Sequence, residues 1–451
     1  MKIIRDMARA NKLLLSNQSY DSNKTYRLLS YVINIKVDDG YLLHNFLTGQ
    51  TLLLSELEFL ALQNRSDIEL LEQLAKNYII VLEKHNDRAL FDTIFLINQQ
   101  FSKTDYINHF VILPTMECNA RCFYCFENGS KRYPMTEQTA YDVADYIEKV
   151  SKGEDVYIQW FGGEPLYNQK AIDLISSSLV KKNINFKSLM VSNGYLFDED
   201  LVWFAKEKWN LQRVQITLDG TQDIYNKYKN YIYKDDPNPF SIVIRNIKLL
   251  LSAEIIVYIR INLGDHNEND MYDLVDYIEK EIGKSPYLHV YTWLLYETRL
   301  SEKDKHTIET KSALIKRQIA LENYIENKSL KIIRPIPNNI CMKACMAEDD
   351  ASIVIMPDGH LGKCDHYSDK NFVGSIYSNA PLDKNITEAW KTKRPENELC
   401  ADCNIFPYCR KLKNCPEFGE ERCTEADKQF RIDQLKRAVL EVYRQYKAQD
   451  I

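Results

Sequence analysis

The middle of the chain alternates short apolar segments with longer amphipathic ones. Between residues 106 and 295, runs rich in β-branched and aromatic residues occur six times, and most are followed by a segment whose apolar residues recur every three or four positions. Repeated strand–helix units of this kind predict a parallel sheet with helices on its outer side. We expect strands at 106–116, 156–163, 188–194, 214–220, 255–263 and 288–295, and helices at 136–150, 171–182, 198–209, 242–253 and 271–283.

The two ends of the chain carry different patterns. Residues 25–55 contain three short apolar runs with turn signals at Asp39-Gly40 and Thr48-Gly49, so we expect a small antiparallel sheet there. Helical periodicity predicts four further helix-like segments, at 55–64, 68–81, 301–332 and 425–449.

The bulk composition excludes several classes of protein. The chain has 451 residues, of which 45% are hydrophobic and 27% charged, so it can build two or three ordinary globular domains. Its formal net charge of −6 argues against a general nucleic-acid binder, because such proteins are usually basic. No apolar run reaches the roughly 18 residues that cross a membrane, and the first residues lack the cleavage site of a secretion signal. We therefore expect a cytoplasmic protein with no membrane or nucleic-acid partner.

Cysteine is the residue type whose distribution points to chemistry. All eleven cysteines follow residue 117, and without a secretion signal they favour metal ligation over disulfides. Cys118, Cys122 and Cys125 lie close together in the sequence. Zinc sites usually take cysteines in two separated pairs, and disulfides would leave one of these three unpaired. A [4Fe–4S] cluster normally takes four thiolates, so a cluster held by these three would keep one iron open for chemistry.

The spacing Cys-x3-Cys-x2-Cys resembles the signature of the radical SAM enzymes, and the order of strands and helices resembles their partial (β/α)6 barrel. In that family the open iron binds S-adenosylmethionine (SAM), and reduction of the cluster yields a 5′-deoxyadenosyl radical that takes a hydrogen atom from the substrate. The resemblance implies that Tyr124 lies near the adenine. Chemistry in parallel barrels takes place at the carboxyl ends of the strands, and Cys118 follows the first strand at that end.

Polar residues at the ends of the next strands extend this resemblance. Gly162-Gly163-Glu164-Pro165 alone is also consistent with a tight turn, but after the cysteine motif it resembles the family's segment that binds the amino group of SAM. The glycines would let backbone approach a ligand closely, and the carboxylate would accept hydrogen bonds from an ammonium group. The resemblance also implies SAM contacts, direct or through supporting side chains, for six residues near the ends of later strands. These are Ser192, Asn193, Thr217, Asp219, Arg260 and Asn262. The alternative is that these residues only form the turns that follow the strands.

The other eight cysteines lie between residues 341 and 423. Two zinc sites would also use eight ligands, but the spacing resembles the SPASM domain, which carries two auxiliary clusters in radical SAM enzymes that modify peptides. The chain departs from that pattern where five residues, and not three, separate Cys409 from Cys415. By the family's interleaved pattern, one auxiliary cluster would take Cys341, Cys345, Cys364 and Cys415, and the other Cys400, Cys403, Cys409 and Cys423. The chain would then hold three [4Fe–4S] clusters and use every cysteine as a ligand.

Two further resemblances concern the substrate. The cysteine-free start resembles, in its order of strands and helices, the winged-helix element that binds leader peptides in maturases of ribosomally made peptides, where the leader adds as a strand to the sheet edge. A simple domain cap is the alternative. Asp365, next to Cys364, resembles the aspartate base of anaerobic sulfatase maturases, which share this architecture, and a surface carboxylate near a cluster is the alternative.

These features predict an α/β protein in four parts: a winged-helix-like leader-binding domain (1–104), a radical SAM partial barrel (105–300), a bridging helix (301–335) and an iron–sulfur SPASM domain (336–451). The predicted function is formation of a thioether or carbon–carbon crosslink in a ribosomally made precursor peptide. The alternatives are a sulfatase maturase that makes formylglycine and a non-catalytic electron-transfer or scaffold protein, while epimerisation and decarboxylation begin with the same hydrogen abstraction. The expected partners are the precursor with its leader and an electron donor such as flavodoxin or ferredoxin.

Overall fold

The computed structural model divides the chain into two compact units. It describes residues 1–7, 15, 19–101, 103–233, 238–264, 267–295, 308–328, 330–332, 345–366, 372–391, 396, 398–409 and 423–449. Unit 1 comprises Met1–Lys103, Arg334–Ala344 and Thr392–Ile451, and unit 2 comprises Thr104–Ile333 and Cys345–Lys391. Unit 1 therefore combines the start of the chain with its last sixty residues or so. Within the described ranges, no helix has the length and apolarity needed to span a bilayer.

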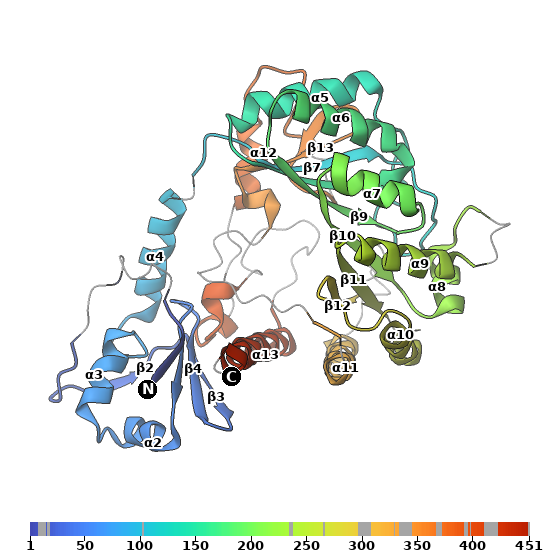
Figure 1. Cartoon of the computed structure of the whole chain (residues 1–451). Helices are drawn as coiled ribbons and strands as arrows, with labels where there is room; N and C mark the ends of the chain where they lie inside the picture. The colour runs from blue at the N-terminus through green and yellow to red at the C-terminus, as the bar shows by residue number, and fades with distance from the viewer. Residues whose placement is uncertain are drawn as a thin grey trace. The chain divides into compact units, whose positions relative to one another are not determined.

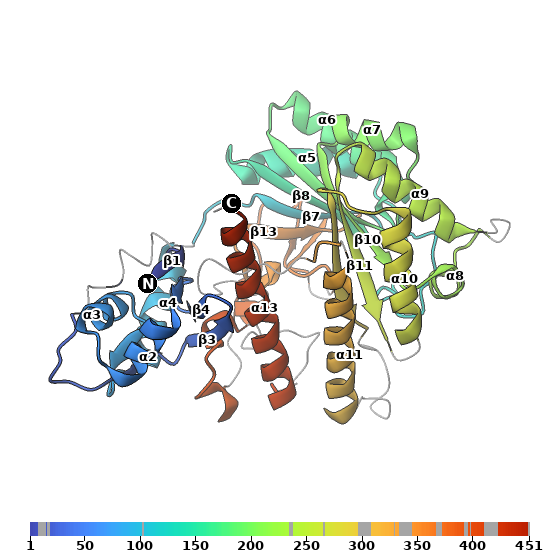
Figure 2. The ribbon, with the colours of Figure 1, turned by 60° about the horizontal axis from the view of Figure 1, so that its bottom comes forward.

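A parallel sheet of six strands in chain order forms the framework of unit 2, which confirms the predicted α/β architecture (Figure 1). Helices lie along the outer side of this curved sheet (Figure 2). The strands are β7 (His109–Thr115), β8 (Val156–Gly162), β9 (Phe186–Ser192), β10 (Leu211–Leu218), β11 (Ile256–Leu263) and β12 (Leu288–Leu294). The helices are α5 (Glu137–Ser151), α6 (Gln169–Lys181), α7 (Glu199–Lys208), α8 (Gln222–Lys229), α9 (Pro239–Ser252), α10 (Glu268–Glu281) and α11 (Ile308–Asn327).

Alternating burial explains how the sheet and helices pack. On β10, Val214, Ile216 and Leu218 are fully buried, whereas Gln215 and Thr217 between them are partly exposed on the inner side. Each helix supplies a matching apolar stripe, and in α5 the buried residues recur every three or four positions. The expected strands and helices of this region are therefore confirmed, but α8 lies in a segment that the sequence pattern left as a loop.

The sheet continues beyond β7 into residues that follow the barrel in sequence. β13 (Ser352–Ile355) pairs in parallel with β7, and β14 (His360–Gly362) and β15 (Gly374–Ser375) follow in antiparallel order. A short 3₁₀ turn (Met346–Glu348) and α12 (Lys384–Lys391) complete this part of unit 2. β14 ends at Gly362, opposite Val354, and Cys364 follows two residues later.

Unit 1 contains the small antiparallel sheet expected from residues 25–55, with one addition. Its order is β1-β5-β4-β3, and the three expected strands are β3 (Val32–Val37), β4 (Gly40–Asn45) and β5 (Thr51–Leu54). β1 (Lys2–Arg5) adds antiparallel to β5 and was not expected. The helices that follow are α2 (Glu56–Asn64), capped by a Ser55–Glu58 capping box, α3 (Ile68–Lys76) and α4 (Asp87–Phe101).

One predicted boundary in unit 1 is wrong. The helix expected at 68–81 ends at Lys76, and Tyr78 adopts a positive φ of 53°. The next residues form β6 (Ile80–Leu82), which pairs antiparallel with β2 (Tyr26–Leu28). The run Ile79-Ile80-Val81 is β-branched throughout, and such residues favour a strand that is paired and packed over a helix end.

Both faces of the unit 1 sheet are covered. Leu43, Leu52 and Leu54 belong to the core that contains the buried residues of α3 and α4, together with Phe406 from the cysteine-bearing segment 398–409. On the other face, Leu42 and Leu53 pack against Val439 and Tyr443 of α13. α13 (Glu425–Gln449) is the helix expected at 425–449, and Figure 1 shows it beside β3 and β4. It therefore completes a unit that begins at the other end of the chain.

Candidate active site

The loop that carries the first three cysteines follows β7 at the carboxyl end of the sheet. The Cys125 N–H donates to the Cys122 carbonyl at 3.1 Å, and the Ala120 N–H donates to Cys118 Sγ at 3.4 Å. Burial raises the pKa of Cys118 to about 12 and that of Cys125 to about 11, and the neighbouring thiols add to both shifts. Such thiols keep their protons at neutral pH unless a metal replaces them. The three thiols thus lie near enough to raise one another's pKa values, and their number suits a [4Fe–4S] cluster with three protein thiolates.

Lys229, the last residue of α8, holds this loop in place. Its ammonium group is almost fully buried, lies 3.1 Å from Asp219 Oδ2 and donates to Tyr124 Oη at 3.0 Å, and Tyr124 Oη donates to the same Asp219 oxygen at 2.7 Å. The Lys229 carbonyl accepts a hydrogen bond from the Arg121 N–H at 2.9 Å and lies 3.9 Å from Cys122 Sγ. Burial is the largest single effect and would lower the pKa of Lys229, but Asp219 together with Tyr124, Cys122 and Tyr225 raises it well above its ordinary value. A positive charge therefore lies beside the loop.

Asp219 connects the loop to the fifth strand of the barrel. Asn262 Nδ2 donates to Asp219 Oδ1 at 2.9 Å, and Arg260 Nε donates to Asn262 Oδ1 at 2.9 Å. Asn267 Nδ2 donates to the Asp219 backbone carbonyl at 2.9 Å. Both oxygens of the Asp219 side chain therefore have partners within the protein. These contacts favour a supporting role for Asp219 and Asn262 over a direct contact with a ligand.

The Gly162-Gly163-Glu164 segment packs directly against the backbone of the cysteine loop. The Gly163 N–H donates to the Thr115 carbonyl at 3.2 Å, and the Glu164 N–H donates to the Glu117 carbonyl at 2.9 Å. A Cβ atom on Gly162 would lie 2.4 Å from Thr115 O, and one on Gly163 would lie 2.2 Å from Glu117 O. The chain's own backbone therefore requires both glycines, whether or not a ligand approaches them.

Glu164 is a fully buried carboxylate that is held by the residues predicted around it. Glu164 accepts hydrogen bonds from Ser192 Oγ at 2.8 Å, the Asn193 N–H at 2.8 Å and the Leu166 N–H at 3.3 Å. Burial nevertheless raises the pKa of Glu164 to about 7. Asn193 Nδ2 also donates to Asn119 Oδ1 at 2.7 Å, which ties the carboxylate to the cysteine loop. A buried carboxylate of this kind is suited to bind an ammonium group.

The remaining predicted contacts lie near this group. Pro165 begins a 3₁₀ turn (Pro165–Asn168) for which Glu164 is the N-cap residue. Thr217 lies on β10 beside Arg260 in the register of β10 and β11. The structure thus brings the predicted residues of five strand ends to one edge of the sheet. Three residues that were not predicted also lie there: Asn119, Lys229 and Asn267. Lys229 carries no sequence signal, because a lysine at the end of a polar helix resembles any exposed lysine.

The late cysteines fall into two described groups. In unit 2, burial raises the pKa of Cys345 and Cys364 adds to the shift, so these two thiols lie close together. In unit 1, burial raises the pKa of Cys403 to about 11, with further contributions from Cys409 and Cys423. No disulfide links any two of the nine described cysteines. Cys341 and Cys415 lie outside the described residues, so the assignment of four ligands to each auxiliary cluster stays a prediction.

Asp365 lies near the cysteine loop and has a partner that was not expected. His366 Nδ1 lies 3.0 Å from Asp365 Oδ1, and the His366 ring lies 4.3 Å from that of Phe126, the residue after Cys125. A small cavity separates these groups from β7 and is lined by Leu113, Met116, Phe126, Glu127, Ser130, Met356, Asp365 and His366. The only sequence signal for His366 was its position next to Asp365.

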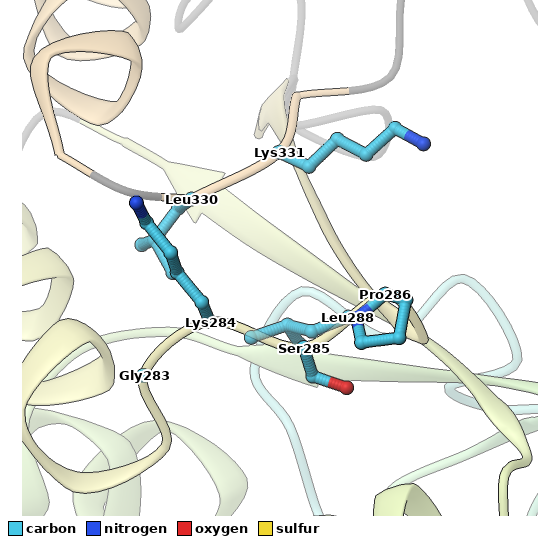
Figure 3. A pocket seen from close by; sticks show the side chains of 7 residues that line it. All are labelled: Gly283, Lys284, Ser285, Pro286, Leu288, Leu330 and Lys331. Carbon is cyan, nitrogen blue, oxygen red and sulfur yellow. The ribbon is translucent and has the colours of Figure 1, made fainter.

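A second cavity, of about 280 Å³, lies where β12 begins and so at the opposite edge of the sheet (Figure 3). It is lined by Gly283, Lys284, Ser285, Pro286, Leu288, Leu330 and Lys331. The lining contains two lysines but no carboxylate, thiol or histidine, and we assign no chemistry to it.

Comparisons with known proteins agree with this geometry. The profile of the radical SAM superfamily matches residues 112–278, which include the cysteine loop and most of the sheet. The cysteine-type anaerobic sulfatase-maturating enzyme of Clostridium novyi is 23% identical over 330 residues, which cover 65% of this chain and 84% of that enzyme.

Two solved structures are similar in fold. Native anSMEcpe with bound AdoMet and Cp18Cys peptide has a TM-score of 0.56 and 17% identity, covering 76% of this chain and 99% of that one. Streptococcus suis SuiB bound to precursor peptide SuiA has a TM-score of 0.51 and 13% identity, covering 86% of this chain and 95% of that one. At these identities the two structures support the fold and not a particular reaction.

Proposed function

We propose that the chain is a radical SAM enzyme that modifies a precursor peptide made on the ribosome. Residues 112–278 match the radical SAM superfamily. The observation that carries this proposal is the small antiparallel sheet of unit 1, which lies outside the residues that match the radical SAM profile. Its outermost strands are β1 and β3, and an edge strand can accept an extended peptide through backbone hydrogen bonds. SuiB, which has a similar fold, was solved with a precursor peptide.

The proposed reaction begins with abstraction of a hydrogen atom from the peptide. When bound, an iron–sulfur cluster and SAM would supply the radical chemistry for this step. Cys118, Cys122 and Cys125 would hold that cluster. Glu164 would accept hydrogen bonds from the ammonium group of SAM, in an orientation that Ser192 and the Asn193 backbone maintain.

Closing a crosslink requires that one proton and one electron leave the peptide after the hydrogen atom has been removed. Asp365, beside Phe126 and the cysteine loop, would accept the proton. We propose that the eight late cysteines hold two auxiliary [4Fe–4S] clusters, which would take the electron, and that a flavodoxin or ferredoxin reduces the first cluster. The expected product is a thioether or carbon–carbon crosslink within the peptide.

One specific observation favours a second candidate function, oxidation of Cys or Ser to formylglycine. The sulfatase-maturating enzyme of Clostridium novyi covers 65% of this chain, and Asp365 directly follows Cys364, the place that the aspartate base takes in the maturases this segment resembles. That activity also needs SAM, a proton acceptor and an electron acceptor, so the residues of the site suit both reactions. The choice between them depends on the peptide.

Mass spectrometry of a co-expressed peptide tests the proposal. The peptide would be encoded by a small open reading frame next to this gene, and the control is the Cys118→Ala/Cys122→Ala/Cys125→Ala variant. A loss of two hydrogens in the peptide supports a crosslink. An unchanged mass with an inverted residue would assign an epimerase, and a formylglycine residue would replace the leading proposal by the second candidate. Absence of 5′-deoxyadenosine from SAM and dithionite would contradict radical chemistry in this chain altogether.

A further inference from the structure

The inner side of the unit 2 sheet carries cations and aromatic rings along β10, β11 and β12. Along β9 to β12, positions that face the helices are buried, and the alternate positions are partly or fully exposed on the inner side. Six of these alternate positions, which we call the basic inner surface, are Arg213, Tyr258, Arg260, His289, Tyr291 and Trp293.

The two arginines of this surface incline toward the end of the sheet that carries the cysteine loop. Arg213 pairs in register with Ile256, but its guanidinium carbon lies 4.8 Å from the ring centre of Tyr258, two residues nearer the carboxyl end. Arg260 likewise lies 4.8 Å from the ring of Trp293, two residues beyond its register partner. Both guanidinium groups therefore extend along the inner side toward the carboxyl ends of the strands, the end at which the cysteine loop lies.

Within strands β7 to β12 these positive charges have no counter-charge on the inner side. The alternate positions of β7 to β12 hold no Asp or Glu, and among described residues no carboxylate forms an ion pair with Arg213 or Arg260. The first carboxylate is Asp219, after β10, and its side chain is occupied by Tyr124, Lys229 and Asn262. His289 also lies among positive charges. Burial lowers its pKa, and the charges of Lys331 and Arg213 lower it further.

We propose that the basic inner surface binds carboxylate side chains of the peptide substrate, so that the substrate is a peptide with Asp or Glu close to the residue that reacts. This inference rests on the proposed function and specifies its substrate class. The chain as a whole has a net charge of −6 and would repel an acidic peptide, whereas a concave surface of one sign attracts it locally. Each guanidinium can bind a carboxylate through two parallel hydrogen bonds, and the adjacent rings cover the methylene groups of a Glu side chain.

Fluorescence anisotropy on the reconstituted full-length enzyme with SAM tests this inference. The probes are a fluorescein-labelled peptide of alternating Glu and Gly and its counterpart with Gln in place of Glu. We expect the Glu peptide to bind about tenfold more tightly than the Gln peptide, and Arg213→Gln and Arg260→Gln each to weaken its binding about tenfold. Arg213→Lys keeps the charge and should lose less affinity for the Glu peptide than Arg213→Gln does. Lys181→Gln, an equal charge change on the exposed end of α6, should have no effect.

Three results would overturn the inference. Equal binding of the Glu and Gln peptides would exclude carboxylate recognition, and equal affinities for Arg213→Gln and Lys181→Gln would exclude this surface. A loss of SAM affinity in the arginine variants with peptide binding intact would assign the arginines to the carboxylate of SAM. Failure of the proposed function is distinguishable, because it would appear as a wild-type enzyme that makes no 5′-deoxyadenosine, whatever peptides it binds.

Discussion

Lys229 and Glu164 are two buried residues of opposite charge that lie beside the loop of Cys118, Cys122 and Cys125. The Lys229 charge lowers the pKa of Glu164, although burial has the larger, opposite effect. Lys229 itself is kept charged by Asp219, and a buried ion pair is strongly destabilised when one partner is removed. At the scale of single residues, these groups set the electrostatic field in which a cluster at Cys118, Cys122 and Cys125 would be reduced.

The first prediction concerns Lys229→Met. Loss of a positive charge beside Cys122 should make reduction of the cluster harder, with a fall in its midpoint potential on the order of 60 mV, which is a tenfold change for one electron. An EPR-monitored redox titration measures this. The control is Lys227→Met, an exposed lysine on the same helix.

The outcome for Lys229 can be separated from misfolding. Lys229→Arg keeps the charge, so the midpoint potential of its cluster should stay close to that of the wild type. Asp219→Asn combined with Lys229→Met removes both members of the ion pair. A potential that is unchanged in the folded Lys229→Met variant would contradict an electrostatic role and leave only a structural one.

The second prediction concerns the pH dependence that Glu164 imposes. Its folded pKa of about 7 exceeds the ordinary value of 4.5, so the folded state binds the extra proton between these values and loses stability as pH rises through that interval. Ionised Glu164 is the form that binds an ammonium group, so SAM affinity should rise toward pH 7 by up to about tenfold per pH unit. Isothermal titration with SAM at several pH values measures this.

Glu164→Gln should weaken SAM binding and flatten its pH profile, because the amide neither ionises nor carries charge. The control is Glu207→Gln on the exposed side of α7. A pH profile of SAM affinity that is the same in wild type and Glu164→Gln would rule out Glu164 as the ammonium partner.

At the scale of elements, α13 replaces solvent on one face of the unit 1 sheet. Val439 and Tyr443 pack on Leu42 and Leu53, and Tyr443 Oη donates to Asp39 at 2.7 Å. Asp39 lies in the turn between β3 and β4, so the hydrogen bond fixes the tip of that hairpin. The helix therefore stabilises the strands that the leader is proposed to join.

The third prediction follows for Tyr443→Ala. Removing a buried aromatic side chain typically costs about 3–5 kcal/mol, so the amides of β3, β4 and β5 should exchange faster with deuterium. Tyr443→Phe keeps the packing and loses only the hydrogen bond, so it should show a much smaller change. Gln445→Ala, at an exposed position on the same helix, should show none. Unchanged exchange in Tyr443→Ala would mean that α13 does not support the sheet.

The fourth prediction concerns leader binding. If the leader adds as a strand, amides of β1 (Lys2–Arg5) or β3 (Val32–Val37) should exchange more slowly when the precursor is present, because these are the outermost strands of the sheet. The matched control is a precursor without its leader, which should protect neither strand. Unchanged exchange at both edges with the full precursor would contradict strand addition.

Strands were predicted correctly where they are long and carry a clear apolar pattern. They were missed where they are short and pair with a strand far away in the sequence. The six barrel strands are confirmed because each has seven or eight residues over which buried positions alternate or, in β7, follow one another almost without a break. β1, β6 and β13 have three or four residues each, and β1 and β13 acquire their strand character from distant partners, β5 and β7. The cysteines and the Gly-Gly-Glu segment carry local signals, but Lys229 reaches Asp219 and Tyr124 only through the folded barrel.

At the scale of the whole molecule, the proposed clusters set a measurable metal content. The fifth prediction is that anaerobic reconstitution loads about twelve irons per chain, four for each of three clusters. The Cys118→Ala/Cys122→Ala/Cys125→Ala variant and the Cys400→Ala/Cys403→Ala variant should each fall to about eight irons, because each loses one cluster. Iron and zinc are measured by plasma mass spectrometry. About four irons in the wild type, or bound zinc, would contradict the two auxiliary clusters.

The position of α13 also sets an order of events during protein synthesis. Val439 leaves the ribosome about 20–80 s after Leu53 at ordinary translation rates of about 5–20 residues per second. In that interval one apolar face of the β3–β5 sheet has no cover, while almost all of unit 2 has already been made. The first-made unit is thus the last to finish folding, so chaperones that shield nascent chains should matter for the yield of this enzyme, and a fusion that hinders residues 425–449 should harm residues 32–54 first.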